Sequence, residues 1–537
     1  MVQSLSVTVA LLLALWVFFA QVMLYATTMW IMDPILSGFV VGLIVHNVPL
    51  GLAIGGSLEL ISLGLWNYGG TIIPDFMAGA VIGTAFASLS QGTLAQATAA
   101  GIAVAIPIAL IFAQGDLLAF TINLAFLHGA DRRIEKHDEK GITWMHLLAI
   151  LPLGLVRAIP AFLVLVLGAI PVQKAFDSIP GWLNRGLTTI GMLLPALGFG
   201  ILLTMLPLRK WWTFFVVGFA LFAYLHVPLI GIAIMAVAFV VIFLSTRPVE
   251  EATLTEDPRL ANPVFAGKSP VTRGDLMKAF WRNATTFEVS FTYERMQALG
   301  CTWSLMPVLR KVYPDEDEYF AALKRHMVFY NTNVIVGGPT IFGAVCALEE
   351  TKHPQMADEL KVSMMGPAAG IGDTITGILI KPIFGVFAAA LALAGNPVAA
   401  LLIMIMNVLF FVIKFPGFWL GYSRGLNLVQ QLSRGIVARV TEAASMIALV
   451  VMGGFIPSIL ASLKTPIAFT KDLIVEGKTV TQTIKLQDSL DNILPAMLPL
   501  ALVFFVYWLI QYKHWTNVKV LLLLIVMALI LGGFKLL

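Results

Sequence analysis

The sequence predicts an all-α polytopic membrane protein, and its composition supports this class in three ways. Of 537 residues, 59% are hydrophobic and only 12% are charged, whereas soluble domains carry about twice that share of charge. This balance excludes both an ordinary soluble domain and a disordered chain. Apolar runs recur at about the 20-residue length that a membrane span needs. The 45 Gly and 27 Pro residues favour broken or re-entrant helices, whose freed backbone groups are satisfied by neighbouring elements.

The first half of the chain, 1–246, is predicted to be one membrane unit. Its N-terminal apolar run continues past Trp30 without a positively charged start, so we interpret it as a retained helix and not as a cleaved leader. The run over 76–127 is long enough for two passes, or for one pass and a re-entrant piece. The candidate membrane segments lie near 6–31, 35–64, 76–127, 143–172, 186–208 and 211–245.

The second half begins after a change of composition. Residues 247–272 are polar, charged and Pro-containing, which is typical of a linker. Residues 273–332 are amphipathic, and we expect helices there, in the cytoplasm or at the membrane surface. A membrane part is predicted over 333–537, interrupted by the polar stretch 463–490, which we interpret as an extramembrane loop or hairpin. Its apolar segments lie near 333–348, 362–395, 397–420, 438–462, 492–511 and 518–536.

The distribution of positive charge predicts an orientation. The loop over 129–142 holds four Lys or Arg residues, and Lys513 and Lys519 flank the last connection. By the positive-inside rule both loops face the cytoplasm, and the C-terminus lies outside.

Three polar side chains in an apolar, Gly-rich stretch form the first candidate site. Glu59, Asn67 and Asp75 lie within 55–75. A carboxylate in the membrane region usually faces a protein interior or a watery cavity, because lipid does not solvate it. Carboxylate and carboxamide groups suit sugar hydroxyls. For Asp75, which follows Pro74, an N-cap role is an equal alternative.

Further polar residues lie in apolar surroundings along the chain. Arg157 is either a snorkelling residue or the buried partner of an acid, with Glu59 and Asp116 as candidates. The segment 366–373 is read as a tight intramembrane turn ending in Asp373, which could instead cap a helix and could pair with Lys381. Asn331, near Asn333, could line a polar path or cap a helix.

Several functional classes are disfavoured. The eight His residues show no metal-ligand spacing, and no nucleophile–base motif occurs. Two Cys residues cannot form a disulfide framework or a zinc site. A net charge of +4 without a basic stripe disfavours nucleic acid. We therefore expect no catalytic residue, no metal and no cofactor, and a permease for a polar solute.

Two sets of motifs resemble a known family. The first comprises Gly55–Gly64 with Asn67, Pro74–Asp75 and Val156–Ala161, and it is similar to the IIC permease component of the mannose-family phosphotransferase system (PTS). The second is similar to the IID component and comprises Tyr293–Gly300, Met306–Arg310, Tyr313–Pro314, Phe329–Thr332, Met365–Asp373, Gly421–Gly425 and Thr441–Ser445. The resemblance covers 1–246 as IIC and 273–537 as IID, with the linker joining them.

The resemblance implies a sugar permease in the bacterial inner membrane. It implies soluble IIA and IIB partners that carry the phosphoryl group, so that this chain binds and moves the sugar without carrying phosphate itself. It also implies a homotrimer and an elevator-like motion of a core domain.

The sequence departs from the family pattern where the substrate path is expected. Thr27–Met32 lacks an Asp and a Gln that often precede the position of Pro34, His46-Asn47 stands for Gly-Asp, and Lys381-Pro382 stands for Arg-Pro. The residues before Glu294 also differ from the family pattern. Amino sugars, ketoses and atypical ligands therefore stay open beside mannose and glucose. The alternative function is a secondary transporter or binding protein of the same fold without phosphoryl coupling.

Overall fold

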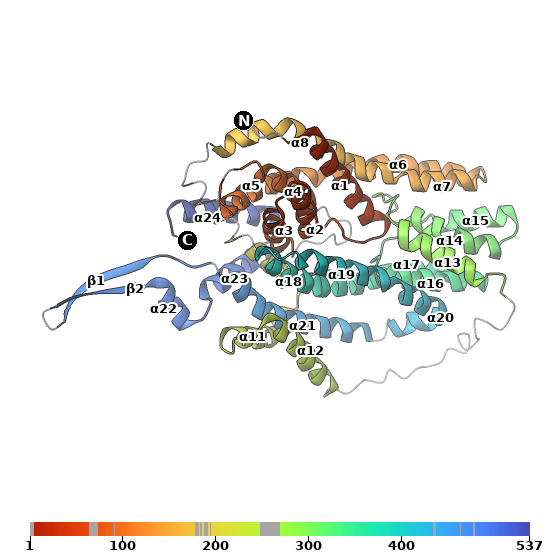
Figure 1. Cartoon of the computed structure of the whole chain (residues 1–537). Helices are drawn as coiled ribbons and strands as arrows, with labels where there is room; N and C mark the ends of the chain where they lie inside the picture. The colour runs from red at the N-terminus through yellow and green to blue at the C-terminus, as the bar shows by residue number, and fades with distance from the viewer. Residues whose placement is uncertain are drawn as a thin grey trace.

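The computed structural model of the chain is a bundle of helices with one two-stranded hairpin in its described part (Figure 1). Asn67 and most of the expected linker lie outside the described residues. The structure describes the chain except residues 1–4, 64–73, 91, 178–181, 183–184, 187–188, 190–191, 194, 247–268, 433–435, 462, 476–477 and 537.

The first half of the chain forms helices joined mostly by short turns. They are α1 (Val7–Ala26), α2 (Pro34–Ile44), α3 (Val48–Ser62), α4 (Phe76–Ala87), α5 (Leu94–Phe112), α6 (Gln114–Glu135), α7 (Glu139–Leu148), α8 (Ile150–Asp177), α10 (Pro195–Met205), α11 (Leu208–Ala223) and α12 (Leu229–Ser245).

The second half adds further helices, a π-helical turn and a hairpin. They are α13 (Arg273–Thr286), α14 (Ala298–Val312), α15 (Glu316–His326), α16 (Gly337–Glu350), α17 (Pro354–Asp373), η3 (Thr374–Ile380), α18 (Lys381–Leu393), α19 (Val398–Val412), α20 (Lys414–Leu432), α21 (Ile436–Ile459), β1 (Ala468–Val475), β2 (Lys478–Lys485), α22 (Leu486–Ile493), α23 (Met497–Gln511) and α24 (Asn517–Gly533).

Five helical stretches among the described residues are long and apolar enough to cross a membrane. A sixth is possible if α22 and α23, which meet at 73°, form one broken span. The five are Val7–Ala26, Leu94–Glu135, Glu139–Gly168, Ala368–Leu393 and Val398–Arg424. Other apolar helices, such as α2 and α3, have 11 and 15 residues, fewer than the roughly 20 that a span requires.

Two glycine-rich segments are helical. Gly55 and Gly56, at the start of the stretch 55–75, are residues of α3. They permit close packing: a Cβ on Gly55 would lie 2.5 Å from the Pro34 carbonyl oxygen. The predicted turn over 366–373 is also helical, within α17, and continues through η3 into α18. The predicted turn over 366–373 was wrong because glycine occurs at close helix contacts as well as at chain reversals.

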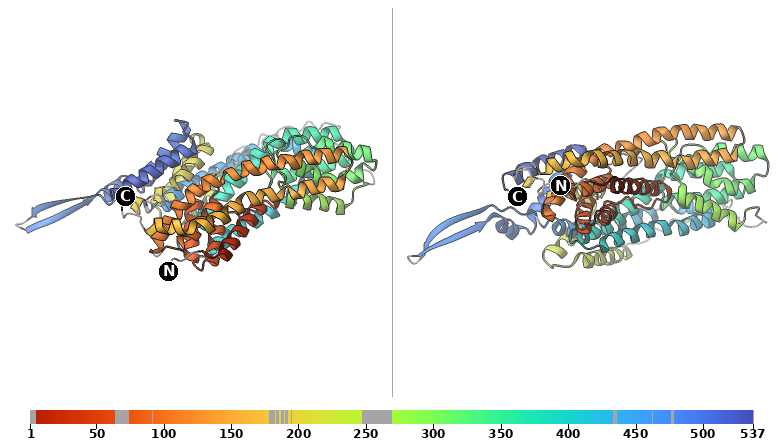
Figure 2. Two further views of the ribbon diagram at one scale, coloured as in Figure 1. Left: turned by 90° about the horizontal axis from the view of Figure 1, so that it is seen from above. Right: turned by 45° about the horizontal axis from the view of Figure 1, so that its top comes forward.

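The two halves of the chain interleave into one bundle (Figures 1 and 2). Helix α21 packs along α11 and α12, α18 packs on α3, and α23 packs on α10. The contact of α11 with α21 depends on glycine, because a Cβ on Gly218 would lie 1.7 Å from the Val450 carbonyl oxygen. The largest apolar core therefore contains residues of both halves, including Ile35, Phe199, Ala389 and Phe455.

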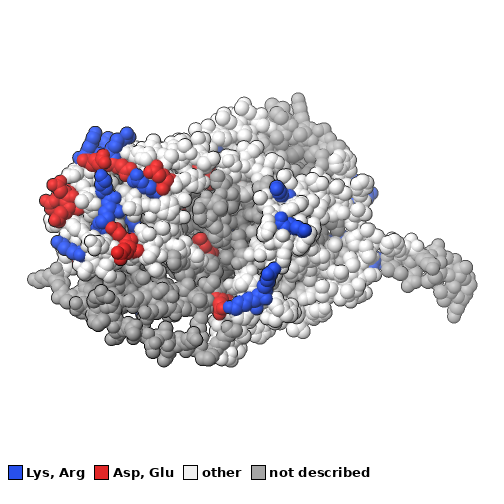
Figure 3. All heavy atoms as spheres, turned by 180° about the vertical axis from the view of Figure 1, so that it is seen from behind, with Lys and Arg blue, Asp and Glu red and all other residues white. Residues whose placement is uncertain are grey.

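The ends of the bundle differ in character. Helices α6, α7 and α13 to α15 lie at one end, and the β1–β2 hairpin projects from the opposite end (Figure 1). The hairpin expected within 463–490 is thus present, with register Ala468 opposite Lys485. In the view of Figure 3, charged side chains gather at the end that holds α15, and most of the visible flank is uncharged. Helix α15 has acids in its first turn and bases in its last, which complements its dipole.

Candidate functional site

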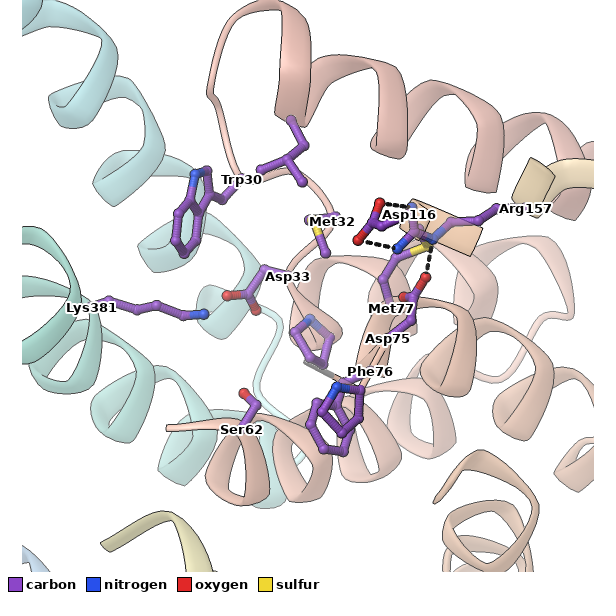
Figure 4. Close-up of a pocket in the computed structure, with 13 residues that line it drawn as sticks. Trp30, Met32, Asp33, Ser62, Asp75, Phe76, Met77, Asp116, Arg157 and Lys381 are labelled. Carbon is purple, nitrogen blue, oxygen red and sulfur yellow. Dashed lines mark hydrogen bonds and ion pairs between the residues drawn. The ribbon is translucent and has the colours of Figure 1, made fainter. Parts of the chain in front are cut away.

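A cavity lined by both apolar and charged side chains lies where α2, α4, α6, α8 and α18 converge (Figure 4). Its empty volume is about 670 Å³, a figure that includes space open to solvent. Lys381 is the one described lining residue from the second half of the chain. The lining residues are Leu24, Trp30, Met32, Asp33, Pro34, Ser62, Pro74, Asp75, Phe76, Met77, Asp116, Arg157 and Lys381.

Asp33 lines the cavity and is also the N-cap residue of α2. Its Oδ1 accepts a hydrogen bond from the Ile35 N–H at 3.1 Å, and Pro34 occupies the first turn, where its missing donor has no cost. The side chain is only 3% exposed. Its Oδ2 accepts no hydrogen bond from a described N–H or hydroxyl group, and the side chain of Lys381 points toward it across the cavity (Figure 4).

Arg157 forms an ion cluster on another side of the cavity. Its Nε donates to Asp75, while Nη1 and Nη2 donate to the two oxygens of Asp116 at 2.7 and 3.0 Å. Tyr25 and Gln21 of α1 also donate to Asp116, at 3.0 and 3.3 Å. The planar guanidinium suits this two-carboxylate arrangement. The cluster therefore ties α1, α4, α6 and α8 together.

This geometry bears on the alternative roles left open for Arg157, which could snorkel or pair with an acid, and for Asp75, which could cap a helix or line a site. Arg157 is 3% exposed and contacts Asp116, whereas Glu59, the other candidate partner, belongs to a different cluster. Asp75 combines two roles, because its Oδ1 also accepts from the Ala78 N–H at 2.9 Å and so caps α4.

Glu59 lies directly behind the cavity wall. It is fully buried, and neither carboxylate oxygen accepts a hydrogen bond from a described donor. Its carboxyl group meets that of Asp33, and a Cβ added to Gly385 of α18 would lie 2.7 Å from Oε1. Two carboxylates in contact repel each other, so this pair attracts a proton or a cation.

The second half of the chain also holds the loop that carries Trp30 and Asp33. The Asn407 side chain accepts from the Trp30 N–H at 2.5 Å and donates to the Trp30 carbonyl at 3.4 Å. Lys414 donates to the carbonyl oxygens of Thr27 and Ala284 at 2.9 and 3.2 Å. The cavity therefore depends on both halves for its shape.

Asn331 and Asp373 lie outside this cavity's lining. The Asn333 amide donates to Asp373 at 2.9 Å and to Thr376 at 3.3 Å, and its oxygen accepts from the N–H groups of Ile335 and Val336. Asp373 makes no side-chain cap bond to η3. The structure thus separates Asp373 and its neighbours from the group around Asp75.

A second buried ion cluster lies at the end that holds α15. Glu349 accepts from Arg325 at 3.0 Å and contacts the His326 ring at 3.1 Å. Burial raises the pKa of Glu349, but the hydrogen bonds and charges of His326 and Arg325 outweigh it and lower the pKa to about 2. Asp358 completes the cluster by accepting from Arg325 at 2.9 Å. This cluster links α15, α16 and α17.

Sequence reasoning missed three residues that line the cavity: Trp30, Asp33 and Ser62. Asp33 precedes a proline at a helix start, which by itself indicates only a cap. The sequence signal that could have identified Asp33 is the position of an acid within an otherwise apolar stretch, since such acids usually face a cavity.

Comparison with known proteins agrees with the two-part organisation. Residues 7–242 match the family described as the PTS system sorbose-specific IIC component, and residues 270–537 match the PTS system mannose/fructose/sorbose family IID component. The chain is 34% identical to the sorbose-specific EIID component of Klebsiella pneumoniae, over 45% of this chain and 89% of that protein. It is 30% identical to the sorbose-specific EIIC component of Lacticaseibacillus casei, over 40% of this chain and 76% of that protein.

Among solved structures, the chain is similar to one chain of the mannose transporter ManYZ in complex with microcin E492. The identity is 29%, the coverage is 50% of this chain and 99% of the other, and the TM-score is 0.29.

The fold and the matches define a membrane permease component built from two parts. The chain belongs to the mannose family of the phosphotransferase system, with the IIC and IID components fused in one chain. It is a multi-pass protein of the bacterial inner membrane.

Proposed function

We propose that this chain binds a sugar in the cavity around Asp33 and Asp75 and moves it across the membrane while a IIB partner phosphorylates it. The observation that carries the proposal is a cavity with charged lining residues from both parts: Asp33, Asp75, Asp116 and Arg157 from the IIC part, and Lys381 from the IID part. Carboxylates there accept hydrogen bonds from sugar hydroxyls, and Trp30 offers an aromatic face.

The substrate contacts divide into two sets. Asp75, Asn67 and, from behind the cavity wall, Glu59 form the primary set, and Arg157 and Lys381 act as charge partners. Asn331 and Asp373 belong to a second polar site along the path through the IID part. The support for this second site is that Asn333 donates at 2.9 Å to Asp373, which lies in the candidate membrane stretch Ala368–Leu393.

The larger arrangement belongs to the same proposal. We assign 1–246 and 273–537 as the two units and 247–272 as their linker. The short helices α2 and α3 form a re-entrant pair, the charged end with α15 faces the cytoplasm, and the protein works as a homotrimer with soluble IIA and IIB. The lengths of α2 and α3 support the re-entrant assignment, and the charges at the end of α6 support the orientation.

Uptake into vesicles tests the proposed function. Vesicles that contain the full chain are given labelled sugars with and without phosphorylated IIB. Sugar phosphate that accumulates only with phosphorylated IIB supports the proposal. Free sugar that accumulates without IIB supports a secondary transporter instead. The Asp75→Asn variant should lose uptake, whereas Glu316→Gln, which alters an exposed acid of α15, should retain it.

A labelling experiment tests whether the chain carries phosphate. Cys301 and Cys346 are buried, and burial raises the pKa of the Cys301 thiol, which disfavours a thiolate. His128 is half-exposed but contacts Glu294 at 3.0 Å and Asp131 at 3.7 Å, so a phosphoryl group there would be repelled. Phosphoenolpyruvate with the general carriers should label IIA and IIB only. A labelled chain that loses its label in His128→Asn would refute this.

A further inference from the structure

Glu59 and Asp33 form a buried pair of acids at the wall of the cavity. The Glu59 side chain is fully buried, the Asp33 side chain is 3% exposed, and their carboxyl groups are hydrogen-bonded to each other. An ionised carboxylate only accepts hydrogen bonds, so two carboxyl groups can bond to each other only if one of them carries a proton. The contact between Glu59 and Asp33 therefore contains a proton.

The charges around Glu59 lead to the same conclusion. Helices α2, α4, α5, α10 and α18 pack on α3, and the only Lys, Arg, His, Asp or Glu residue within these five helices is Lys381. The N-cap residue of α2 is Asp33, and that of α4 is Asp75, which accepts a hydrogen bond from Arg157. Lys381 is thus the cation that faces the two acids, and a second, uncompensated carboxylate would be costly to bury. One proton on the pair balances the charge.

The surroundings of the two acids differ, and this difference places the proton on Glu59. Asp33 accepts from the Ile35 N–H at 3.1 Å and faces the Lys381 side chain (Figure 4). A hydrogen-bond donor and a cation both favour the ionised form of an acid, whereas burial favours the neutral form. No described N–H or hydroxyl group donates to Glu59. Glu59 is therefore the partner that donates, and Asp33 is the partner that accepts.

We propose that Glu59 is a positioning residue of the sugar cavity, which in its protonated form donates a hydrogen bond to Asp33 and holds the Asp33 carboxylate at the cavity wall. The proposal rests on the proposed sugar-binding function and assigns a protonation state and a mode of action to Glu59. Asp33 lines the cavity and Glu59 lies behind it, so Glu59 acts on a ligand through Asp33.

The shared proton gives sugar binding a direction of pH dependence. At neutral pH the pair is protonated and intact. When the pH rises far enough to remove the proton, two carboxylates remain in contact and repel each other, so Asp33 is no longer held and sugar affinity falls. In Glu59→Gln the amide donates to Asp33 at every pH, so the alkaline loss of affinity should disappear.

Infrared spectroscopy of the purified full chain tests the proton directly. At neutral pH the natural chain should show the C=O stretching band of a protonated carboxylic acid, and Glu59→Gln should lack it. Asp33→Asn should also lack the band, because the remaining acid then ionises beside Lys381, and this variant serves if Glu59→Gln fails to fold. The matched control is Glu349→Gln, which removes a buried acid whose pKa is about 2 and should keep the band. A band that persists in either folded variant of the pair would overturn the proposal.

Sugar binding to the full chain tests the positioning role, with mannose, fructose, sorbose and glucosamine as probes. Glu59→Leu removes the donor and should bind the preferred probe about 10–100-fold more weakly than Glu59→Gln does. Raising the pH should weaken binding to the natural chain and to Glu316→Gln, which alters an exposed acid, but not to Glu59→Gln.

Equal affinities of Glu59→Leu and Glu59→Gln, or an alkaline loss that Glu59→Gln shares, would overturn the positioning role and leave the sugar-binding function intact. If the natural chain binds none of the four probes, the sugar-binding function and the positioning role both fail, and the infrared band still decides whether Glu59 holds the proton.

Discussion

On one side of the cavity, Arg157 lies between the carboxylates of Asp75 and Asp116, and each of its three nitrogen atoms donates a hydrogen bond to one of them. On the other side, Asp33 and Glu59 are hydrogen-bonded to each other, and no described N–H or hydroxyl group donates to three of their oxygens. Both sides are buried to a similar degree. They differ in how the acids are satisfied, by a cation on one side and by a shared proton on the other.

This difference separates a structural task from a binding task. A buried ion cluster with complete hydrogen bonds resists change, because removing one member leaves the others unpaired. A buried pair of acids, by contrast, is stabilised when it takes up a proton or a cation. The Arg157 side therefore ties four helices together, and we propose that the ligand contacts the Asp33 side as well as Asp75.

The largest effect is expected from breaking the complete cluster. Arg157→Leu leaves Asp75 and Asp116 buried without their cation, which costs about 3–5 kcal/mol of stability. The control is Arg133→Leu, which removes an exposed pair with Asp138 and should cost at most about 1 kcal/mol. Thermal unfolding of the detergent-solubilised variants measures both.

A rescue variant sharpens this result. Replacing Asp116 by Asn in the Arg157→Leu background removes one of the two stranded charges and should recover part of the lost stability. If the double variant is no more stable than Arg157→Leu, the loss does not come from uncompensated charge, and the division between the two sides of the cavity fails.

The sequence predicted the fold class, because each long apolar run indicates a span on its own. It did not predict that 35–64 would divide into α2 and α3. That division depends on contacts between the two helices: a Cβ on Gly38 would lie 2.2 Å from the Gly51 carbonyl oxygen. Such contacts join residues that no local pattern connects, so periodicity could not reveal them.

The site was predicted in part for the same reason. Acids in apolar stretches identified Glu59 and Asp75 one at a time, because the cost of burial acts on each residue alone. No local pattern indicates that Asp33 and Lys381 face each other, since they lie on different halves of the chain. Their proximity follows from the packing of α18 on α3.

The Glu349 cluster offers a second complete ion cluster and predicts a pH dependence. The pKa of the Glu349 carboxyl is about 2 in the folded chain, against an ordinary value of 4.5. Because the folded pKa is lower, the stabilisation is fully present above about pH 4.5 and is lost as the pH falls toward 2. It amounts to roughly 3 kcal/mol.

Acid unfolding measures this contribution. The stability difference between the natural chain and Glu349→Gln should shrink between pH 5 and pH 2, whereas the difference for the exposed Glu316→Gln should stay below about 1 kcal/mol throughout. A difference for Glu349→Gln that does not change with pH would contradict the role of its charge.

A smaller effect is expected at the contact that holds Trp30. Asn407→Ala removes both hydrogen bonds to the Trp30 backbone and should cost about 1–3 kcal/mol. Because this loop also carries Asp33, sugar affinity should fall by more than in Asn396→Ala, which removes an exposed side chain that accepts a hydrogen bond from the Val398 N–H. Equal affinities in the two variants would show that the IID part does not shape the ligand side of the cavity.

The smallest effect is expected from cutting the linker. The two halves contact each other through α11 and α21, α3 and α18, and α10 and α23, so their association does not depend on a covalent connection. A protease site inserted near Asn262, within the polar stretch 247–272, should yield two fragments that co-purify and keep the sugar affinity of the intact chain. The control is the same insertion without protease. If one fragment is lost on mild washing, the interleaved contacts are too weak to hold the cavity, and the fusion itself maintains the ligand side that Lys381 completes.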